Sequence, residues 1–132
     1  MINYVNKHIM YEYKCILRRI IDGDSIVLDI DLGFKVFLLK QVVRLYGIDT
    51  PESRTRNLEE KKLGLKSKDR LKELLTKKFI IKTTLDTKGK FGRILAIPYV
   101  QHPKLGYINV CTQLISENHA RAYFGGKKLS WT

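Results

Sequence analysis

Two short acidic motifs in this chain each end an apolar run: Asp22-Gly-Asp24 and Asp49-Thr-Pro-Glu52. Arg44 stands five residues before the second motif, and Arg93 follows later in the chain. Carboxylate oxygens are the ligands that hard cations prefer, and the guanidinium fork of arginine matches a phosphate. Metal-binding carboxylates, a further carboxylate that acts as a base and two arginines are the groups needed to cut a phosphodiester bond.

Each of these residues also has a simpler interpretation when it is taken alone. Asp22 and Asp24 are typical of a capped turn, and Glu52 is typical of the first turn of a helix. Arg44 would then pair with a nearby aspartate, and Arg93 would be an ordinary charge at a strand edge. The presence of all these groups in one chain favours the catalytic interpretation.

The charge of the chain indicates a polyanionic partner. Its 132 residues include 25 Lys and Arg against 13 Asp and Glu, a formal net charge of +12. The excess is local, since residues 54–93 hold 14 basic and 5 acidic side chains. Such a surface binds nucleic acid by releasing condensed counterions. A solvated surface that only confers solubility is the plainer alternative, and an anionic membrane is a weaker one because no expected helix pairs a basic face with exposed aromatics.

Length and cysteine spacing limit the other possibilities. We expect one domain over residues 1–132, with an N-terminal extension at 1–10 and a short tail at 125–132. Cys15 and Cys111 have no metal-binding spacing, so we interpret them as buried thiols, although a disulfide between them stays open. The first residues have no apolar segment of signal-peptide length, which leaves an intracellular protein or a mature secreted form as the expectation.

The first third of the chain predicts three strands. β-Branched and aromatic residues fill positions 11–45, with turns at Asp22-Gly-Asp24 and at Asp31-Leu-Gly33. Segments 26–32 and 34–45 would form a hairpin about the second turn. Gly47 and Pro51 then break the pattern and place the second acidic motif on a loop, where functional residues are common.

A helix should follow at Asn57-Leu-Glu-Glu60, which has the form of a capping box. The Asn57 side chain would accept from a backbone amide of the first turn, and Glu60 would reach back to the amide of Asn57. Small or apolar residues then recur at helical spacing and should face the core. These are Gly64, Ser67, Leu71, Leu74 and Leu75.

The remaining chain predicts two strands and a second helix. Strands at 79–84 and 94–100 would flank a turn at 86–89, and a short helix at 110–117 would end at Asn118 in a left-handed conformation. The tail has no helical period and should pack Trp131 onto the body. Five strands, with one helix after the third and another after the fifth, predict a small OB-type barrel, closed or partly open.

Three segments together resemble one known family. In order and in spacing, Ile21-Asp-Gly-Asp-Ser25, Arg44-Leu-Tyr-Gly-Ile-Asp-Thr-Pro-Glu52 and Lys90-Phe-Gly-Arg93 are similar to the staphylococcal nuclease (thermonuclease) family. The resemblance extends over about residues 14–123. It implies a five-stranded OB-fold barrel, dependence on Ca²⁺, and hydrolysis of DNA and RNA that leaves 3′-phosphate and 5′-hydroxyl ends.

The resemblance also implies a ligand set for calcium. Asp24 and Asp49 would bind the ion directly, Thr50 would contribute its backbone carbonyl, and Asp22 would stand behind them through water. The residue types agree with this independently, because calcium accepts mixed carboxylate, carbonyl and water oxygens. No histidine stands near either acidic motif to favour zinc.

The remaining roles concern water and substrate. By the same resemblance, Glu52 would activate or orient the attacking water, and Arg44 and Arg93 would hold the scissile phosphate. Lys90, Phe91 and either Tyr123 or Phe124 would contact the flanking substrate.

The sequence departs from the family pattern in two places. Phe91 stands where the family often has tyrosine, and it stacks on a base without donating a hydrogen bond to a phosphate. We expect the C-terminal helix of the family to be reduced or absent, because only a short segment without helical period follows Gly125-Gly126.

Two functions from different classes therefore compete. We expect a calcium-dependent, sugar-nonspecific nuclease, monomeric and without a membrane partner, that prefers single-stranded DNA and RNA. The alternative is a nonenzymatic OB-fold module that binds single-stranded nucleic acid with the same basic surface and exposed aromatics. A module of that kind has no need for the acidic motifs and the arginines together, and their joint presence favours the nuclease.

Overall fold

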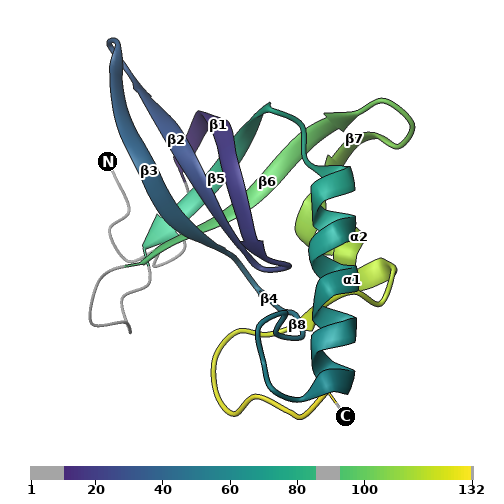
Figure 1. The fold of residues 1–132 in the computed structure, drawn as a ribbon. Coiled ribbons are helices and arrows are strands. Elements are labelled where there is room, and N and C mark those ends of the chain that lie inside the picture. The colour runs from purple at the N-terminus through teal and green to yellow at the C-terminus, as the bar shows by residue number, and fades with distance from the viewer. Residues whose placement is uncertain (1–10, 86–92, 132) are drawn as a thin grey trace.

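The computed structural model describes residues 11–85 and 93–131 (Figure 1). The extension at 1–10, the turn expected at 86–89, and the candidates Lys90 and Phe91 lie outside these residues. The elements in chain order are β1 (Tyr11–Asp22), β2 (Ser25–Gly33), β3 (Val36–Leu45), β4 (Ile48–Asp49), α1 (Leu58–Leu74), β5 (Lys78–Leu85), β6 (Ile94–His102), β7 (Gly106–Asn109), α2 (Val110–Ser116) and β8 (Arg121–Ala122).

The main sheet curls into a barrel. Its strand order is β3-β2-β1-β5-β6-β7, with antiparallel neighbours throughout. A further parallel pairing joins Val43–Leu45 of β3 to Ile94–Ala96 of β6 and brings the two sides of the sheet together. Because that contact is only three residue pairs long, the barrel is partly open. The OB-type architecture predicted from the sequence is confirmed.

Both predicted hairpins are present, but only the first turn lies where it was predicted. The second lies at Phe34 and Lys35, because β2 continues through Asp31–Gly33. β1 and β2 meet at Asp22 and Ser25, which are register partners on either side of Gly23 and Asp24. The β2–β3 turn takes positive φ angles at Gly33 (84°), Phe34 (54°) and Lys35 (63°). The tight first turn matters most for the site, because it holds Asp24 at the end of the barrel.

The core combines the inward faces of the strands with both helices. α1 contributes Leu71 and Leu74, α2 contributes Leu114, and all three side chains are fully buried. The predicted inward residues of α1, Gly64 and Ser67 among them, are buried as expected. Figure 1 shows α1 standing along one side of the barrel with its first turns near β4 and β8.

Of the two contacts predicted for the capping box of α1, the one made by Asn57 is confirmed and the one made by Glu60 is wrong. The Asn57 side chain accepts from the amides of Glu59 and Glu60, both at 3.1 Å. Glu60 does not reach back to Asn57, whose amide instead donates to Thr55 Oγ1 at 3.2 Å. The carboxylate of Glu60 accepts from the backbone amide of Glu52 at 3.0 Å. A local hydroxyl therefore replaces the acid at the cap, and the acid holds the loop that carries the second acidic motif.

Three short strands were not predicted. β7 extends the sheet beyond β6, and β4 pairs with β8 through Ile48 with Ala122 and Asp49 with Arg121. The prediction that the second acidic motif lies on a loop is therefore wrong for Asp49, whose backbone pairs with Arg121, 72 positions later in the sequence. It is confirmed for Thr50 to Glu52. Asn118 ends α2 with a φ of 63°, as predicted.

The remaining expectations concern the tail, the cysteines and membranes. The described tail contains no helix after α2, in agreement with the prediction. Cys15 and Cys111 are buried free thiols, and burial raises the pKa of each to about 12. Among the described residues, no helix combines the length and the apolar character needed to cross a membrane.

Candidate active site

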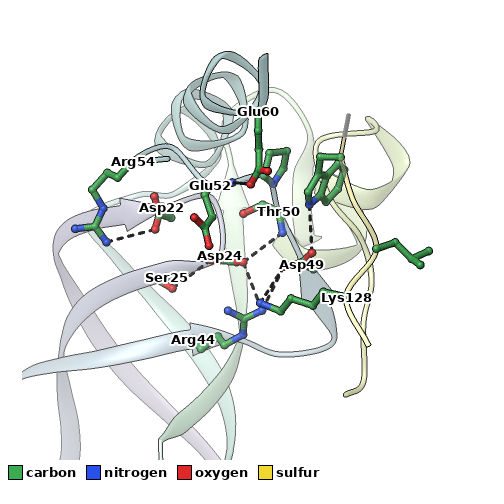
Figure 2. A pocket seen from close by; sticks show the side chains of 13 residues that line it. Asp22, Asp24, Ser25, Arg44, Asp49, Thr50, Glu52, Arg54, Glu60 and Lys128 are labelled. Atoms are coloured by element: carbon green, nitrogen blue, oxygen red, sulfur yellow. Dashed lines mark hydrogen bonds and ion pairs between the residues drawn. The ribbon is translucent and has the colours of Figure 1, made fainter. Parts of the chain in front are cut away.

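A cavity of about 560 Å³ opens where the two acidic motifs meet (Figure 2). The β1–β2 turn, the end of β3, β4 with the loop that follows it, the first turn of α1 and the C-terminal tail all contribute to its walls. The charged side chains that line it are Asp22, Asp24, Arg44, Asp49, Glu52, Arg54, Glu60 and Lys128. Six of the residues predicted for the site, including Thr50, therefore share one cavity.

Asp24 and Asp49 converge on one nitrogen. Nη2 of Arg44 lies 3.5 Å from Oδ2 of Asp24 and 3.7 Å from Oδ1 of Asp49. The same nitrogen donates to the carbonyl of Ile48 at 3.3 Å. Both aspartates are buried, at 6% and 5% exposure. Two carboxylates held this close in a buried setting repel one another unless a cation lies between them. Arg44 supplies part of that positive charge.

Backbone and hydroxyl groups fix the position of Asp24. The amide of Thr50 donates to its Oδ2 at 3.2 Å, and Ser25 Oγ donates to its Oδ1 at 3.2 Å. Thr50 Oγ1 is buried and has no hydrogen-bond partner in the described part of the chain. A Cβ on Gly23 would lie 3.0 Å from that oxygen and 2.9 Å from Ser67 Cβ. Glycine at this turn therefore allows the first acidic motif to approach the second.

Asp22 lies on the same cavity but keeps different partners. Ser53 Oγ donates to its Oδ1, and Nη2 of Arg54 lies 3.6 Å from its Oδ2. No contact joins Asp22 to Arg44 among the described residues. This separation is compatible with the predicted place of Asp22 behind the direct ligands, which stays a prediction.

Glu52 combines a fixed backbone with an exposed side chain. Its amide is held by the Glu60 carboxylate at 3.0 Å. On the other side, its carbonyl lies so close to α1 that a Cβ on Gly64 would be 2.3 Å from the oxygen. The side chain itself is exposed and lines the cavity. The carboxylate thus reaches solvent at the mouth of the site from an anchored position.

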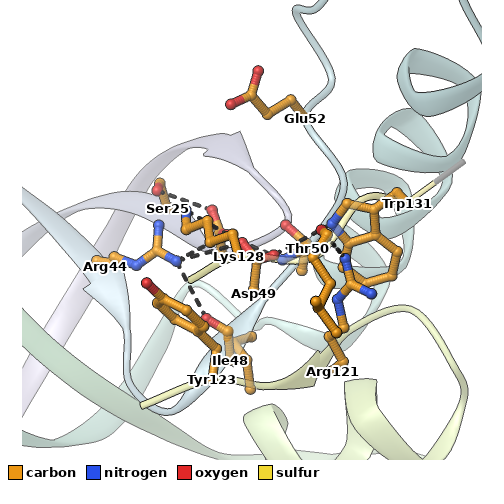
Figure 3. Close-up of polar contacts among 12 residues, drawn as sticks. Ser25, Arg44, Ile48, Asp49, Thr50, Glu52, Arg121, Tyr123, Lys128 and Trp131 are labelled. Carbon is orange, nitrogen blue, oxygen red and sulfur yellow. Dashed lines mark hydrogen bonds and ion pairs between the residues drawn. The ribbon is translucent and has the colours of Figure 1, made fainter. Parts of the chain in front are cut away.

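The tail contributes two residues that the sequence did not assign to the site. Nζ of Lys128 lies 3.4 Å from Asp49 Oδ1, and Nε1 of Trp131 donates to Asp49 Oδ2 at 3.3 Å (Figure 3). Sequence analysis placed Trp131 on the body without a location and gave Lys128 no role. The only available signal was the run of basic residues followed by a lone Trp at the end of the chain.

Arg93 is described but does not line this cavity in the described residues. It is exposed and comes immediately before β6, whose Leu95 is the register partner of Arg44. Arg93 therefore stands just outside the strand that pairs with the strand of Arg44. The role of Arg93 in holding the phosphate stays a prediction.

The two aromatic candidates flank the cavity without lining it in the described residues. The amide of Tyr123 donates to Gly47 O at 2.9 Å, and its ring lies 5.4 Å from Nζ of Lys128. Phe124 is 72% exposed and packs edge-on against Tyr46, with 5.7 Å between ring centroids. Substrate contact by either residue is not tested by this geometry.

The donor set of the cavity fits calcium better than a transition metal. No group of three or more His, Cys, Asp or Glu side chains within the described ranges is close enough to hold a metal ion. The site instead offers two buried carboxylates, with backbone carbonyls and solvent close by, and all of these donors are oxygens. Calcium accepts such mixed sets, whereas zinc prefers nitrogen and sulfur. Asp24 and Asp49 are therefore the described residues that could hold a calcium ion.

Comparisons with known proteins relate this chain to one family. The sequence profile of the family described as Staphylococcal nuclease homologue matches residues 42–130. A thermonuclease of Staphylococcus intermedius is 32% identical over 110 residues, which is 83% of this chain and 59% of the relative. A thermonuclease of Staphylococcus hyicus is 34% identical over 113 residues, 85% of this chain and 59% of the relative. The chain thus spans about three fifths of the length of each relative.

The profile match begins after the first acidic motif. Asp22 and Asp24 lie outside it, and the fold nevertheless brings Asp24 against Asp49 through the shared contact with Arg44.

Proposed function

Because the chain belongs to the staphylococcal nuclease family, we propose that it is a calcium-dependent nuclease that hydrolyses phosphodiester bonds in both DNA and RNA. The products would carry 3′-phosphate and 5′-hydroxyl ends. One observation carries the proposal: Asp24 and Asp49, 25 positions apart in sequence, converge on Arg44 in a cavity that Glu52 also lines. A module that only binds nucleic acid has no use for buried carboxylates that repel phosphate.

The buried carboxylates account for the metal requirement. Asp24 and Asp49 would hold the calcium ion, with the carbonyl of Thr50 as a further ligand and Asp22 behind them through water. Bound there, calcium would offset the negative charge of the phosphate and help to place the water. Without a metal ion, only Arg44 and the half-exposed Lys128 would offset the two aspartates, which would otherwise repel the substrate.

Glu52 is the candidate for activation of the attacking water. A base must reach the proton that it accepts, and the exposed carboxylate of Glu52 at the cavity mouth meets that condition. Its anchored backbone limits the positions that the carboxylate visits, which lowers the entropic cost of aligning water with the phosphorus.

Arg44 is the candidate for stabilising the transition state. Within the described ranges its polar contacts all use Nη2, so Nε and Nη1 are left for phosphate oxygens. Negative charge on the non-bridging oxygens grows as the water attacks, and a fixed guanidinium binds that form more strongly than the ground state. Arg93, immediately before the neighbouring strand β6, would supply the second guanidinium.

The basic surface would hold the strands that flank the cleaved bond. Lys90, Phe91 and one of Tyr123 and Phe124 would contact this part of the substrate. Phosphate contacts of this kind confer affinity without sequence preference and weaken as salt rises. The preference for single strands follows because a bare backbone reaches a cavity at the end of a barrel more easily than a duplex does.

One observation favours the nonenzymatic alternative. Tyr107 is 61% exposed and stacks on Tyr99 with 5.9 Å between centroids, and Nζ of Lys82 lies 4.8 Å from the centre of the Tyr99 ring. Aromatic and cationic side chains in this arrangement suit unpaired bases. The two tyrosines lie on β6 and β7 and do not line the cavity, so they could bind bases without any part in cleavage.

A cleavage assay separates the two functions. The purified chain is incubated with denatured DNA or with RNA, in calcium or in a chelator, beside a Glu52→Gln variant. We expect cleavage of both substrates in calcium alone, and a rate at least about 100-fold lower in the variant, as is usual for loss of a general base. Absence of cleavage above the variant, with binding to single strands retained, would support the nonenzymatic module instead.

A further inference from the structure

The two carboxylate oxygens of Asp49 contact different side chains, and two of these side chains, Lys128 and Trp131, belong to the C-terminal tail. Oδ1 faces Nη2 of Arg44 at 3.7 Å and Nζ of Lys128 at 3.4 Å. Oδ2 accepts the indole N–H of Trp131 at 3.3 Å. Oδ1 thus lies near two positive charges, whereas Oδ2 accepts a hydrogen bond from a neutral donor. A cation held between Asp24 and Asp49 would need Oδ1, because that oxygen shares Arg44 with Asp24.

Trp131 is held in place by a residue of the barrel end. The guanidinium carbon of Arg121 lies 3.7 Å from the centre of the Trp131 ring system. Arg121 also donates to the carbonyls of Leu129 and Ser130, the latter at 3.2 Å. Since Arg121 is the register partner of Asp49 in the β4–β8 pair, the tail is tied down directly beside the carboxylate that it contacts. Figure 3 shows Trp131 and Arg121 stacked beside Asp49.

The contact of Trp131 is compatible with a bound cation. An indole N–H only donates and carries no charge, so it binds Oδ2 without opposing positive charge at Oδ1. Hydrogen bonds to the second oxygen of a ligating carboxylate fix its orientation and commonly change metal affinity. Trp131 would therefore keep Oδ1 directed toward Asp24 and the cation.

The contact of Lys128 has the opposite consequence. Its ammonium carries the same sign of charge as the cation and lies against the oxygen that the cation needs. The side chain is 50% exposed, so it can move into solvent or toward a phosphate when the cation enters. A cation must displace this ammonium, and the displacement costs binding free energy.

We propose that the C-terminal tail sets the cation affinity of Asp49 through two opposed contacts: Trp131 positions the carboxylate for the cation, and Lys128 competes with the cation for Oδ1. The proposal rests on the calcium site of the proposed function. It makes Trp131 a positioning residue, and it predicts effects of opposite sign for two residues only three positions apart.

Calorimetric titration of calcium into the full chain at low salt tests the proposal. Trp131→Phe keeps a ring on Arg121 but removes the N–H, and we expect about 10-fold weaker binding. Lys128→Gln removes the competing charge, and we expect about threefold tighter binding, an advantage that salt reduces. Lys127→Gln is the matched control, because this exposed neighbour makes the same charge change and should stay within about twofold of wild type.

A spectroscopic measurement follows the contact without any metal. The chain contains one Trp, so its nitrogen-15 correlation spectrum holds a single indole N–H signal. In calcium-free protein, Asp49→Asn should shift that signal, and the hydrogen bond should survive when calcium is added to wild type. An indole signal that is the same in wild type and in Asp49→Asn would overturn the contact itself. This measurement does not need the Trp131 variant to fold.

The possible outcomes distinguish a failure of the tail proposal from a failure of the proposed nuclease function. Shifts of the two variants in the same direction, or shifts no larger than that of the Lys127 variant, would overturn the tail proposal and leave the nuclease intact. Wild-type protein that binds no calcium would overturn both. Weaker binding by Trp131→Phe together with tighter binding by Lys128→Gln would support the proposal, since general loosening of the tail cannot give opposite signs.

Discussion

The molecule buries aspartates at two places, and it neutralises them differently. On β2, Asp29 is 2% exposed, and both of its oxygens have close partners. Arg18 Nε donates to Oδ2, and the backbone amide of Lys40 donates to Oδ1 at 2.8 Å. At the end of the barrel, Asp24 and Asp49 share one arginine nitrogen at 3.5 and 3.7 Å. The first centre is closed by its own ion pair, whereas the second has two carboxylates and looser contacts.

This difference separates a structural carboxylate from one that can bind a ligand. The hydrogen bond from Arg18 lowers the pKa of Asp29, with help from the amide of Lys40. Its charge is therefore satisfied within the protein, and no oxygen is directed to a cavity. Asp24 and Asp49 instead face a cavity of about 560 Å³, where a further cation can replace or join the existing partners. Burial of acids alone does not identify a metal site. Asp24 and Asp49 are better candidates than Asp29 because they face a cavity and their balancing charges, Arg44 and a half-exposed Lys128, lie 3.4–3.7 Å away.

The largest difference between the two centres should appear when one aspartate at each centre is replaced by asparagine. Asp49→Asn removes a proposed ligand, and we expect the rate of cleavage to fall at least about 100-fold with little loss of stability, since a buried charge is also removed. Asp29→Asn should lower the melting temperature because Arg18 loses its partner. Its cleavage rate per folded molecule should stay near wild type. Equal cleavage rates for the two variants, after correction for the folded fraction, would show that Asp49 is no more important for catalysis than Asp29.

The two arginines of these centres should also respond differently to lysine. Arg44→Lys replaces a fixed fork by a point charge, and we expect kcat to fall about 100-fold while KM changes little. Arg18→Lys keeps the charge of an ion pair whose arginine is 48% exposed, and its kcat should be unchanged. Steady-state kinetics on denatured DNA would measure both. Equal loss in binding and turnover for Arg44→Lys would argue against its role in the transition state.

A smaller effect is expected from the packing that anchors Glu52. In Gly64→Ala, the new Cβ would meet the carbonyl of Glu52 at 2.3 Å, so α1 or the loop must shift. We expect kcat to fall about 10-fold through misplacement of the carboxylate, and stability to fall by about 1–3 kcal/mol. Lys62→Ala, on the exposed side of the same helix, is the control and should change neither. Activity that survives in Gly64→Ala would show that the Glu52 backbone tolerates movement.

The smallest expected effect is the loss of stability at low pH that results from protonation of Asp29. Because the folded-state pKa of Asp29 is lowered, its ion pair stabilises the protein above the ordinary aspartate pKa. That contribution should be lost as the pH falls below about 4 and the carboxyl takes up a proton. Chemical unfolding at several pH values should therefore show wild type and Asp29→Asn drawing closer in stability toward low pH. A constant difference between them would exclude this ion pair as the cause.

Local sequence signals predicted a large part of this structure. Alternation and turn residues gave the first three strands, and Asn57 marked the start of α1 because a capping side chain acts within a few residues. The motif spacing identified Asp24, Arg44 and Glu52 as candidates, and the fold places all of them on one cavity.

Contacts between distant parts of the chain were the ones missed. The pairing of Asp49 with Arg121, which removes Asp49 from a loop, joins two strands of only two residues each, too short for any periodic pattern. Trp131 meets Asp49 across 82 positions, and no local rule selects that partner. Glu60 was assigned to the nearest amide that the capping box offers, but tertiary structure gave it the amide of Glu52. In each case the choice of partner depends on packing rather than on spacing.

Calcium binding itself is the most direct test of the comparison between the two centres. Calorimetric titration would compare wild type, a double variant with Asp24→Asn and Asp49→Asn, and Asp29→Asn as the control for loss of a buried acid. We predict saturable binding of calcium by wild type and by Asp29→Asn, and none by the double variant. Calcium binding by the double variant equal to that of wild type would contradict the assignment of Asp24 and Asp49 as the metal site.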